Sequence, residues 1–109
     1  MNGVAPEAVH LYKQARQKAD NGEFQQAMTI LIKATEICPH YSQAYNELGI
    51  CSEYVNEHDA ALTYYEKAIL TDPMHADAWF NKGMSLKRKG LDKESLQCIE
   101  KAIDLYVGR

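Results

Sequence analysis

The chain has 109 residues, which is enough for one domain and too few for two. Hydrophobic residues make up 46% of the sequence, a share that favours a packed core over disorder, and its three prolines and six glycines leave room for long helices. The formal net charge of −3 argues against a DNA- or RNA-binding protein, because polyanion binders normally carry a positive excess.

Six helices are predicted, and they come in pairs. In chain order they cover residues 7–21, 24–37, 42–55, 58–71, 76–89 and 92–106. A turn former separates the two helices of each pair, at Gly22, Asn56 and Gly90. Glycine and asparagine tolerate the left-handed backbone conformation that ends a helix. We expect Asp92 to act as the N-cap of the last helix, because a carboxylate can accept the unpaired amides there.

The three pairs are copies of one 34-residue unit. The tetrapeptide Glu-Lys-Ala-Ile stands at residues 66–69 and returns unchanged at residues 100–103. Pro39 and Pro73 keep the same spacing, and each is expected to close the second helix of its pair. A lead-in therefore precedes three repeats, and these segments are residues 1–7, 8–41, 42–75 and 76–109.

Large and small residues alternate on the faces that the helices of one repeat turn toward each other. Tyr45, Leu48 and Gly49 are spaced i, i+3 and i+4, which places them on one face of a helix. Ala61 and Tyr65 share a face of the next helix in the same way. Small side chains allow two helix backbones to approach closely, and large ones fill the neighbouring gaps. The sequence therefore predicts antiparallel helical hairpins.

This pattern resembles the tetratricopeptide repeat family. The matching residues of the second repeat are Ala44, Tyr45, Leu48, Gly49, Ala61, Tyr65, Ala68 and Pro73. Those of the third are Ala78, Trp79, Gly83, Gly90 and Ala102. The first repeat departs from the pattern, with Gln14 where an apolar residue is usual and Ala15 for glycine. The resemblance implies an all-α fold, a right-handed superhelix of three stacked antiparallel helix-turn-helix repeats, with the first helices lining the concave side.

A protein–protein interaction module, such as a scaffold, adaptor or chaperone-like domain, is the function that this fold implies. It would hold a peptide segment of a partner protein in the concave groove. The residues expected to bind the peptide are Tyr12, Lys13, Arg16, Asn46, Ile50, Phe80, Asn81, Met84, Lys87 and Arg88. Exposed apolar side chains ringed by polar ones are typical of partner sites. The alternative for any one of these residues is that it only solvates its helix.

One subclass of the family clamps the C-terminal carboxylate of heat-shock chaperones with a fixed set of lysine, asparagine and arginine side chains on the first helices. At the corresponding places this chain has Tyr12, Arg16, Glu47, Asp77 and Asn81. The two acidic side chains would repel a carboxylate. We therefore predict that the domain is not a clamp for chaperone C-termini.

Charge is unevenly spread between the second and third repeats. Residues 42–75 hold six acidic side chains and one lysine, whereas residues 82–93 hold five cationic side chains and one aspartate. Cations at the end of a helix favour its dipole, which is one explanation of the basic stretch. The other is a site that steers an acidic partner.

No pattern of catalytic or cofactor-binding residues stands out, so we predict neither an enzyme nor a cofactor. Cys38, Cys51 and Cys98 are odd in number and form no CxxC, which disfavours a disulfide framework and indicates a reducing compartment such as the cytoplasm. Cys38, His40 and His75 lie in adjacent loops but lack the paired spacing of a zinc site, and no metal is predicted. No apolar stretch approaches the roughly 20 residues that span a bilayer, and we expect no membrane insertion.

The last repeat is expected to present an apolar edge. Its exposed positions are Leu96, Ile103 and Leu105, equivalent to Leu62, Ile69 and Thr71, which would pack on a following repeat. No capping helix follows them in the sequence. We expect either self-association through this edge, for example as a homodimer, or a longer parent protein. A structural unit that dimerises or polymerises end to end is thus the alternative function.

Overall fold

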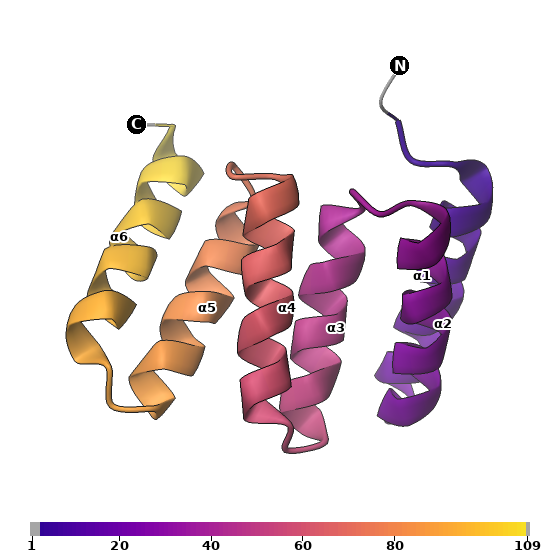
Figure 1. Cartoon of the computed structure of the whole chain (residues 1–109), viewed down its shortest axis with the longest axis horizontal. Coiled ribbons are helices and arrows are strands. Elements are labelled where there is room, and N and C mark those ends of the chain that lie inside the picture. The colour runs from indigo at the N-terminus through magenta and orange to yellow at the C-terminus, as the bar shows by residue number, and fades with distance from the viewer. Residues whose placement is uncertain (1–2, 109) are drawn as a thin grey trace.

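The computed structural model describes residues 3–108 and shows six α-helices standing in a row (Figure 1). They are α1 (Pro6–Asp20), α2 (Phe24–Ile37), α3 (Ser42–Tyr54), α4 (His58–Thr71), α5 (Ala76–Arg88) and α6 (Asp92–Val107). Each begins and ends within one residue of its predicted bounds, and the described residues contain no strand. Residues 1–2 of the predicted lead-in and residue 109 of the third repeat lie outside the described residues.

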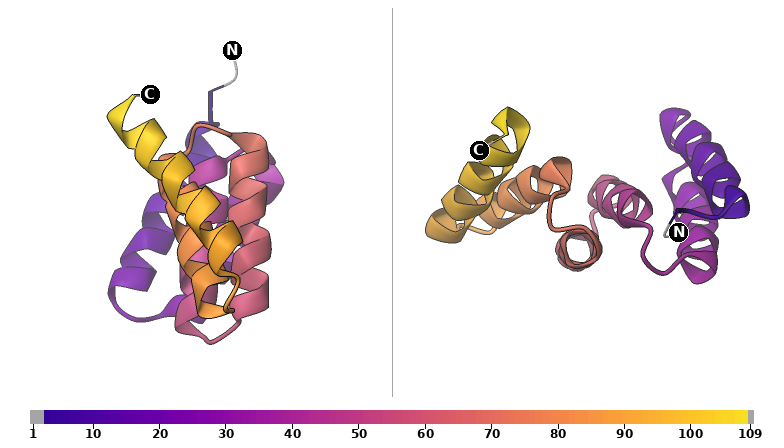
Figure 2. Two further views of the ribbon diagram at one scale, coloured as in Figure 1. Left: turned by 90° about the vertical axis from the view of Figure 1, so that its left-hand side faces the viewer. Right: turned by 90° about the horizontal axis from the view of Figure 1, so that it is seen from above.

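The helices form three antiparallel hairpins stacked side by side. The members of each pair pack on one another, and α2 also packs on α3 as α4 does on α5. The first helices touch along the row, α1 with α3 and α3 with α5, whereas no second helix contacts another second helix within residues 3–108. The row therefore bends toward the side of the first helices, and its two ends turn the same way (Figure 2). The predicted all-α superhelix of three repeats is confirmed.

The turns inside the hairpins follow the predicted chemistry. Gly22, Asn56 and Gly90 adopt φ values of +80°, +63° and +81°, in the left-handed region that glycine and asparagine tolerate. The predicted cap at Asp92 is wrong. Leu91 is the N-cap residue, and its carbonyl accepts from the Ser95 amide at 2.9 Å. Because Asp92 is already helical, its carboxylate only favours the helix dipole from the first turn.

Proline decides where the second helices stop. α2 ends at Ile37 and α4 at Thr71, each two residues before its proline. The third repeat has Val107 in place of proline, and α6 continues to that residue. It ends against Gly108, which takes a φ of +78° as a C-cap. The missing proline thus lengthens α6 by two residues relative to the repeat pattern.

Aromatic side chains tie the first turn of α3 and of α5 to the loop before it. The Tyr45 hydroxyl donates to the Pro39 carbonyl at 3.0 Å, and the Trp79 Nε1–H donates to the Pro73 carbonyl at 2.7 Å. These two bonds are related by the 34-residue period, and each fixes the path of the chain between repeats.

Removing one of these bonds tests its share of the stability. We expect Tyr45→Phe to lower the free energy of unfolding by about 0.5–1.5 kcal/mol, the usual net value of one hydrogen bond. Tyr64→Phe is the matched control, since its hydroxyl makes no hydrogen bond among the described residues. Urea unfolding followed by circular dichroism measures both. Equal midpoints for the two variants would show that the Tyr45 bond contributes nothing.

Candidate functional site

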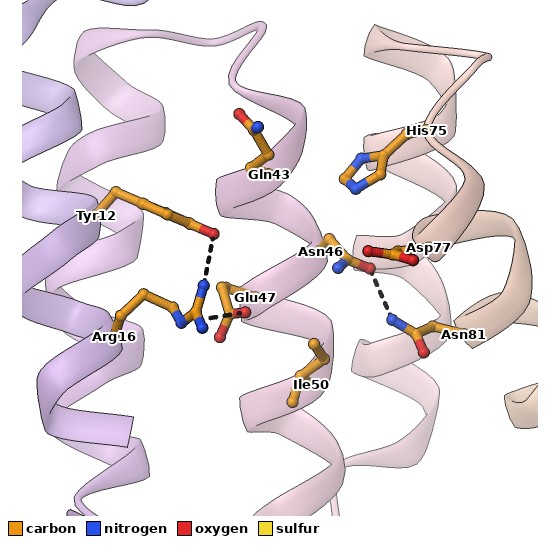
Figure 3. A pocket seen from close by; sticks show the side chains of 9 residues that line it. All are labelled: Tyr12, Arg16, Gln43, Asn46, Glu47, Ile50, His75, Asp77 and Asn81. Carbon is orange, nitrogen blue, oxygen red and sulfur yellow. Dashed lines mark hydrogen bonds and ion pairs between the residues drawn. The ribbon is translucent and has the colours of Figure 1, made fainter. Parts of the chain in front are cut away.

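A hollow of about 630 Å³ lies on the inner side of the superhelix, where the first helices meet. Its lining, shown in Figure 3, comes from α1, α3, α5 and the loop before α5. The lining residues are Tyr12, Arg16, Gln43, Asn46, Glu47, Ile50, His75, Asp77 and Asn81. All three repeats contribute to it, because each first helix turns the same face inward.

On one side of the hollow, Arg16 links two other side chains of the lining. Its Nη1–H donates to the Tyr12 hydroxyl at 3.2 Å, and its Nε lies 3.7 Å from Glu47 Oε1 (Figure 3). Burial raises the pKa of the Glu47 carboxyl, and the Arg16 charge partly offsets this. The Tyr12 ring packs on Tyr41 with 5.3 Å between centroids. Tyr12, which was expected to face a bound peptide, is therefore also part of the packing, because its ring is half-buried against the core.

The opposite side is held by a pair of amides. Asn81 Nδ2 donates to Asn46 Oδ1 at 3.0 Å, and this bond joins α3 to α5 (Figure 3). Asn46 is buried. One donor of Asn81 and the side-chain oxygen of Asn46 are therefore engaged in this hydrogen bond. Their remaining amide groups are what a bound backbone could use.

A neutral histidine closes the upper rim of the hollow. The Ser42 hydroxyl donates to the Ala68 carbonyl at 2.7 Å, and His75 Nδ1 lies 2.7 Å from the same hydroxyl oxygen. Since that hydroxyl hydrogen is already used, Nδ1–H of the ring is the donor to Ser42. Burial lowers the pKa of His75, against the opposing effect of Asp72 and Asp77. The ring therefore joins two repeats as a neutral donor.

Half of the predicted peptide-binding residues line this hollow. They are Tyr12, Arg16, Asn46, Ile50 and Asn81, and the remaining five are Lys13, Phe80, Met84, Lys87 and Arg88. Phe80 and Met84 are exposed, as predicted, but lie outside the hollow. Four further lining residues, Gln43, Glu47, His75 and Asp77, are not among the ten predicted peptide-binding residues, although three of them lie on the first helices, which were expected to line the concave side. The helical spacing of Gln43 with Glu47 and of Asp77 with Asn81 is a signal for three of them, whereas no periodicity marks the loop residue His75.

Acidic side chains of the second repeat form ion pairs with basic side chains of the third. Arg88 Nη1 lies 2.7 Å from Glu53 Oε1, and Lys82 Nζ lies 3.5 Å from Glu66 Oε2. Lys89 pairs with Asp59 at 2.5 Å and holds the pKa of that carboxyl below its usual range. The basic third repeat thus pairs with the acidic second one.

The cysteines are free thiols in the packed interior. Cys51 and Cys98 are buried on α3 and α6, where they pack as small core residues. Burial raises the pKa of the Cys51 thiol to about 11, which keeps it protonated at neutral pH. The Cys38 sulfur lies 3.8 Å from His40 Nε2, and no group of three metal-ligating side chains gathers anywhere in residues 3–108. None of the helices described here is long and apolar enough to cross a membrane.

Comparison with known proteins agrees with this geometry. A model of the tetratricopeptide repeat family matches residues 53–106. The crystal structure of MamA superposes with a TM-score of 0.88 and 28% sequence identity, covering 94% of this chain and 60% of that one. This is a tetratricopeptide-repeat domain. Such a domain is a protein–protein interaction module.

Two other proteins are similar to this domain, one in its fold and one over a short stretch of sequence. The second such domain of Spaghetti (RPAP3), solved with the HSP90 peptide SRMEEVD, has a TM-score of 0.88 and 15% identity over 92% of this chain and 93% of that one. At that identity the likeness concerns the fold alone. A protein of Methanocaldococcus jannaschii is 42% identical over 40 residues, which are 37% of this chain and 46% of that protein. The chain thus spans less than half of that relative.

Proposed function

We propose that the domain acts as a scaffold or adaptor that binds a peptide segment of a partner protein in the hollow on its inner side. The observation that carries this proposal is a single hollow lined by the first helices of all three repeats. It offers amide donors and acceptors at Asn46 and Asn81 and an apolar contact at Ile50, the mixture that an extended segment needs. Neither catalysis nor a cofactor is part of the proposal. The three free cysteines favour the cytoplasm as the compartment.

Selection from a library of random decapeptides displayed on phage tests this proposal. We expect the selected peptides to bind Ile50→Asp at least tenfold more weakly than the unchanged domain, because a charge would replace the apolar contact in the lining of the hollow. Ile32→Asp is the control, since Ile32 is exposed on α2, outside the hollow. Circular dichroism checks that both variants fold. Peptides that bind the Ile50 variant as well as the unchanged domain would place the binding surface elsewhere.

The HSP90 peptide SRMEEVD is expected not to bind this groove. Glu47 and Asp77 stand in the lining, and the guanidinium of Arg16 is already paired with Glu47. An acidic peptide would therefore meet repulsion without a free cation to offset it. Isothermal titration calorimetry up to millimolar peptide should show no saturable heat. Saturable binding in the micromolar range would mean that these acidic side chains do not prevent clamping.

Self-assembly through α6 is the second candidate function, and the exposure of its apolar face favours it. Leu96 is 57% exposed and Ile103 45%, whereas the equivalent Leu62 and Ile69 of α4 are half-buried. Leu105, which was also expected to be exposed at this edge, is instead half-buried. Burying one such side chain contributes roughly 1.5–3 kcal/mol. This face is what a second copy of the domain would cover.

Light scattering on a size-exclusion column tests the self-assembly. We expect the unchanged domain to form a dimer or larger species across the micromolar range, and Leu96→Glu/Ile103→Glu to elute as a monomer. Each new carboxylate would have to lose its hydration at the interface. A monomer for the unchanged domain at every concentration would remove this candidate.

A further inference from the structure

A second hollow continues the inner groove at the ends of α1 and α3. Its volume is about 450 Å³, and it shares Arg16, Glu47 and Ile50 with the first hollow. The residues that line this second hollow are Arg16, Ala19, Asp20, Gly22, Phe24, Glu47, Ile50 and Tyr54. Because the two hollows share part of their walls, a segment lying in the first can place a side chain in the second.

Negative charge prevails in this second hollow. Two carboxylates, those of Asp20 and Glu47, share the single guanidinium of Arg16. The ion pair with Glu47 is long, at 3.7 Å, and Arg16 also gives a hydrogen bond to Tyr12. Burial raises the pKa of Glu47, the Arg16 charge lowers it, and the nearby Asp20 charge raises it again, so the second carboxylate opposes part of what Arg16 compensates. One further positive charge would neutralise the cluster.

An exposed aromatic ring stands beside these carboxylates. Tyr54 stacks on Phe24 with centroids 4.4 Å apart and an interplanar angle of 3°. Tyr54 is nevertheless 65% exposed, so its ring is accessible from solvent. An aromatic face next to carboxylates is a composition suited to a cationic side chain, because the ring and the charges attract it together.

We propose that the second hollow binds the side chain of an arginine in the partner segment. This inference rests on the proposed peptide binding in the first hollow. Arginine fits better than lysine because its planar guanidinium can lie on the Tyr54 ring while its N–H groups reach the carboxylates of Asp20 and Glu47. The groove would thereby select a basic segment, the opposite of the acidic HSP90 peptide.

A titration with N-acetylarginine amide, followed by NMR on the ¹⁵N-labelled domain, tests the arginine site directly. N-acetylcitrulline amide is the matched probe, because citrulline has the same shape without the charge. We expect saturable shifts of the backbone amides around the second hollow, and a dissociation constant about tenfold lower for the arginine probe. The variant Asp20→Asn/Glu47→Gln should lose this preference. Glu36→Gln/Glu100→Gln, which makes the same change of net charge at exposed sites outside the hollow, should keep it.

Each result separates the arginine site from the proposed peptide binding. Equal shifts with the two probes, or an arginine preference that survives in Asp20→Asn/Glu47→Gln, would overturn the arginine site. Phage peptides that depend on Ile50 but contain no arginine would also overturn it, and would leave the peptide-binding function standing. If no phage peptide depends on Ile50, the peptide binding proposed for the first hollow fails, whereas the NMR titration still decides whether the second hollow binds arginine.

Discussion

Replacing Gly49 with alanine is expected to destabilise the domain by about 1–3 kcal/mol, the usual cost of an overfilled core. A Cβ at this position would lie 2.3 Å from Cε1 and 2.9 Å from Cζ of the Tyr65 ring. Tyr65 lies on α4 and is only 2% exposed, so its ring is buried against the α3 backbone at Gly49. Either the two helices separate or the ring leaves its rotamer. Urea unfolding monitored by circular dichroism gives the change in midpoint.

The first repeat supplies the compensating change for Gly49→Ala. At the equivalent positions it has Ala15 and Leu31, both buried, so an alanine is tolerated where the facing side chain is a leucine. We therefore expect Tyr65→Leu to recover part of the loss, with a coupling energy of about 0.5–3 kcal/mol in the double-mutant cycle. Effects of Gly49→Ala and Tyr65→Leu that simply add would show that this contact is not the cause.

Leu48→Ala is expected to cost about 2–5 kcal/mol, which is a large share of the stability of a domain of this size. Leu48 is 0% exposed on α3, because the middle repeat is covered by helices of both neighbours. Truncation there leaves a cavity that stacked helices on both sides cannot easily close. The variant should unfold at a clearly lower temperature in calorimetry, or fail to fold at 37 °C.

Gln14→Ala is the matched control for Leu48→Ala. Gln14 holds the same repeat position on α1, but no repeat precedes it in the described structure and it is exposed. Its truncation should change the free energy of unfolding by no more than about 0.5 kcal/mol. Similar losses from the two variants would mean that burial between neighbouring repeats does not decide the cost.

Much of the fold could be predicted because its signals are local and repeat three times. Gly22, Asn56 and Gly90 fix the turns through their own backbone preference. The helical spacing of the residues around Gly49 and around Tyr65 predicts which faces of the two helices pack together, and the structure brings these two residues into contact. The cap at Asp92 was predicted wrongly. The path of the chain after the Gly90 turn makes Leu91 the N-cap, one residue earlier than predicted.

The sequence by itself determined the helices, their turns and their order, and its resemblance to the tetratricopeptide repeat family implied the side of the superhelix on which the first helices lie. Only the tertiary structure decided which groove residues bind one another. The bonds of Asn46 with Asn81 and of Glu53 with Arg88 each join residues 35 positions apart, and Ser42 meets His75 across 33. The periodicity of the sequence predicts the helix face on which each of these side chains lies. The angle between neighbouring helices and the choice of rotamer determine its partner, and both arise only when the repeats are stacked.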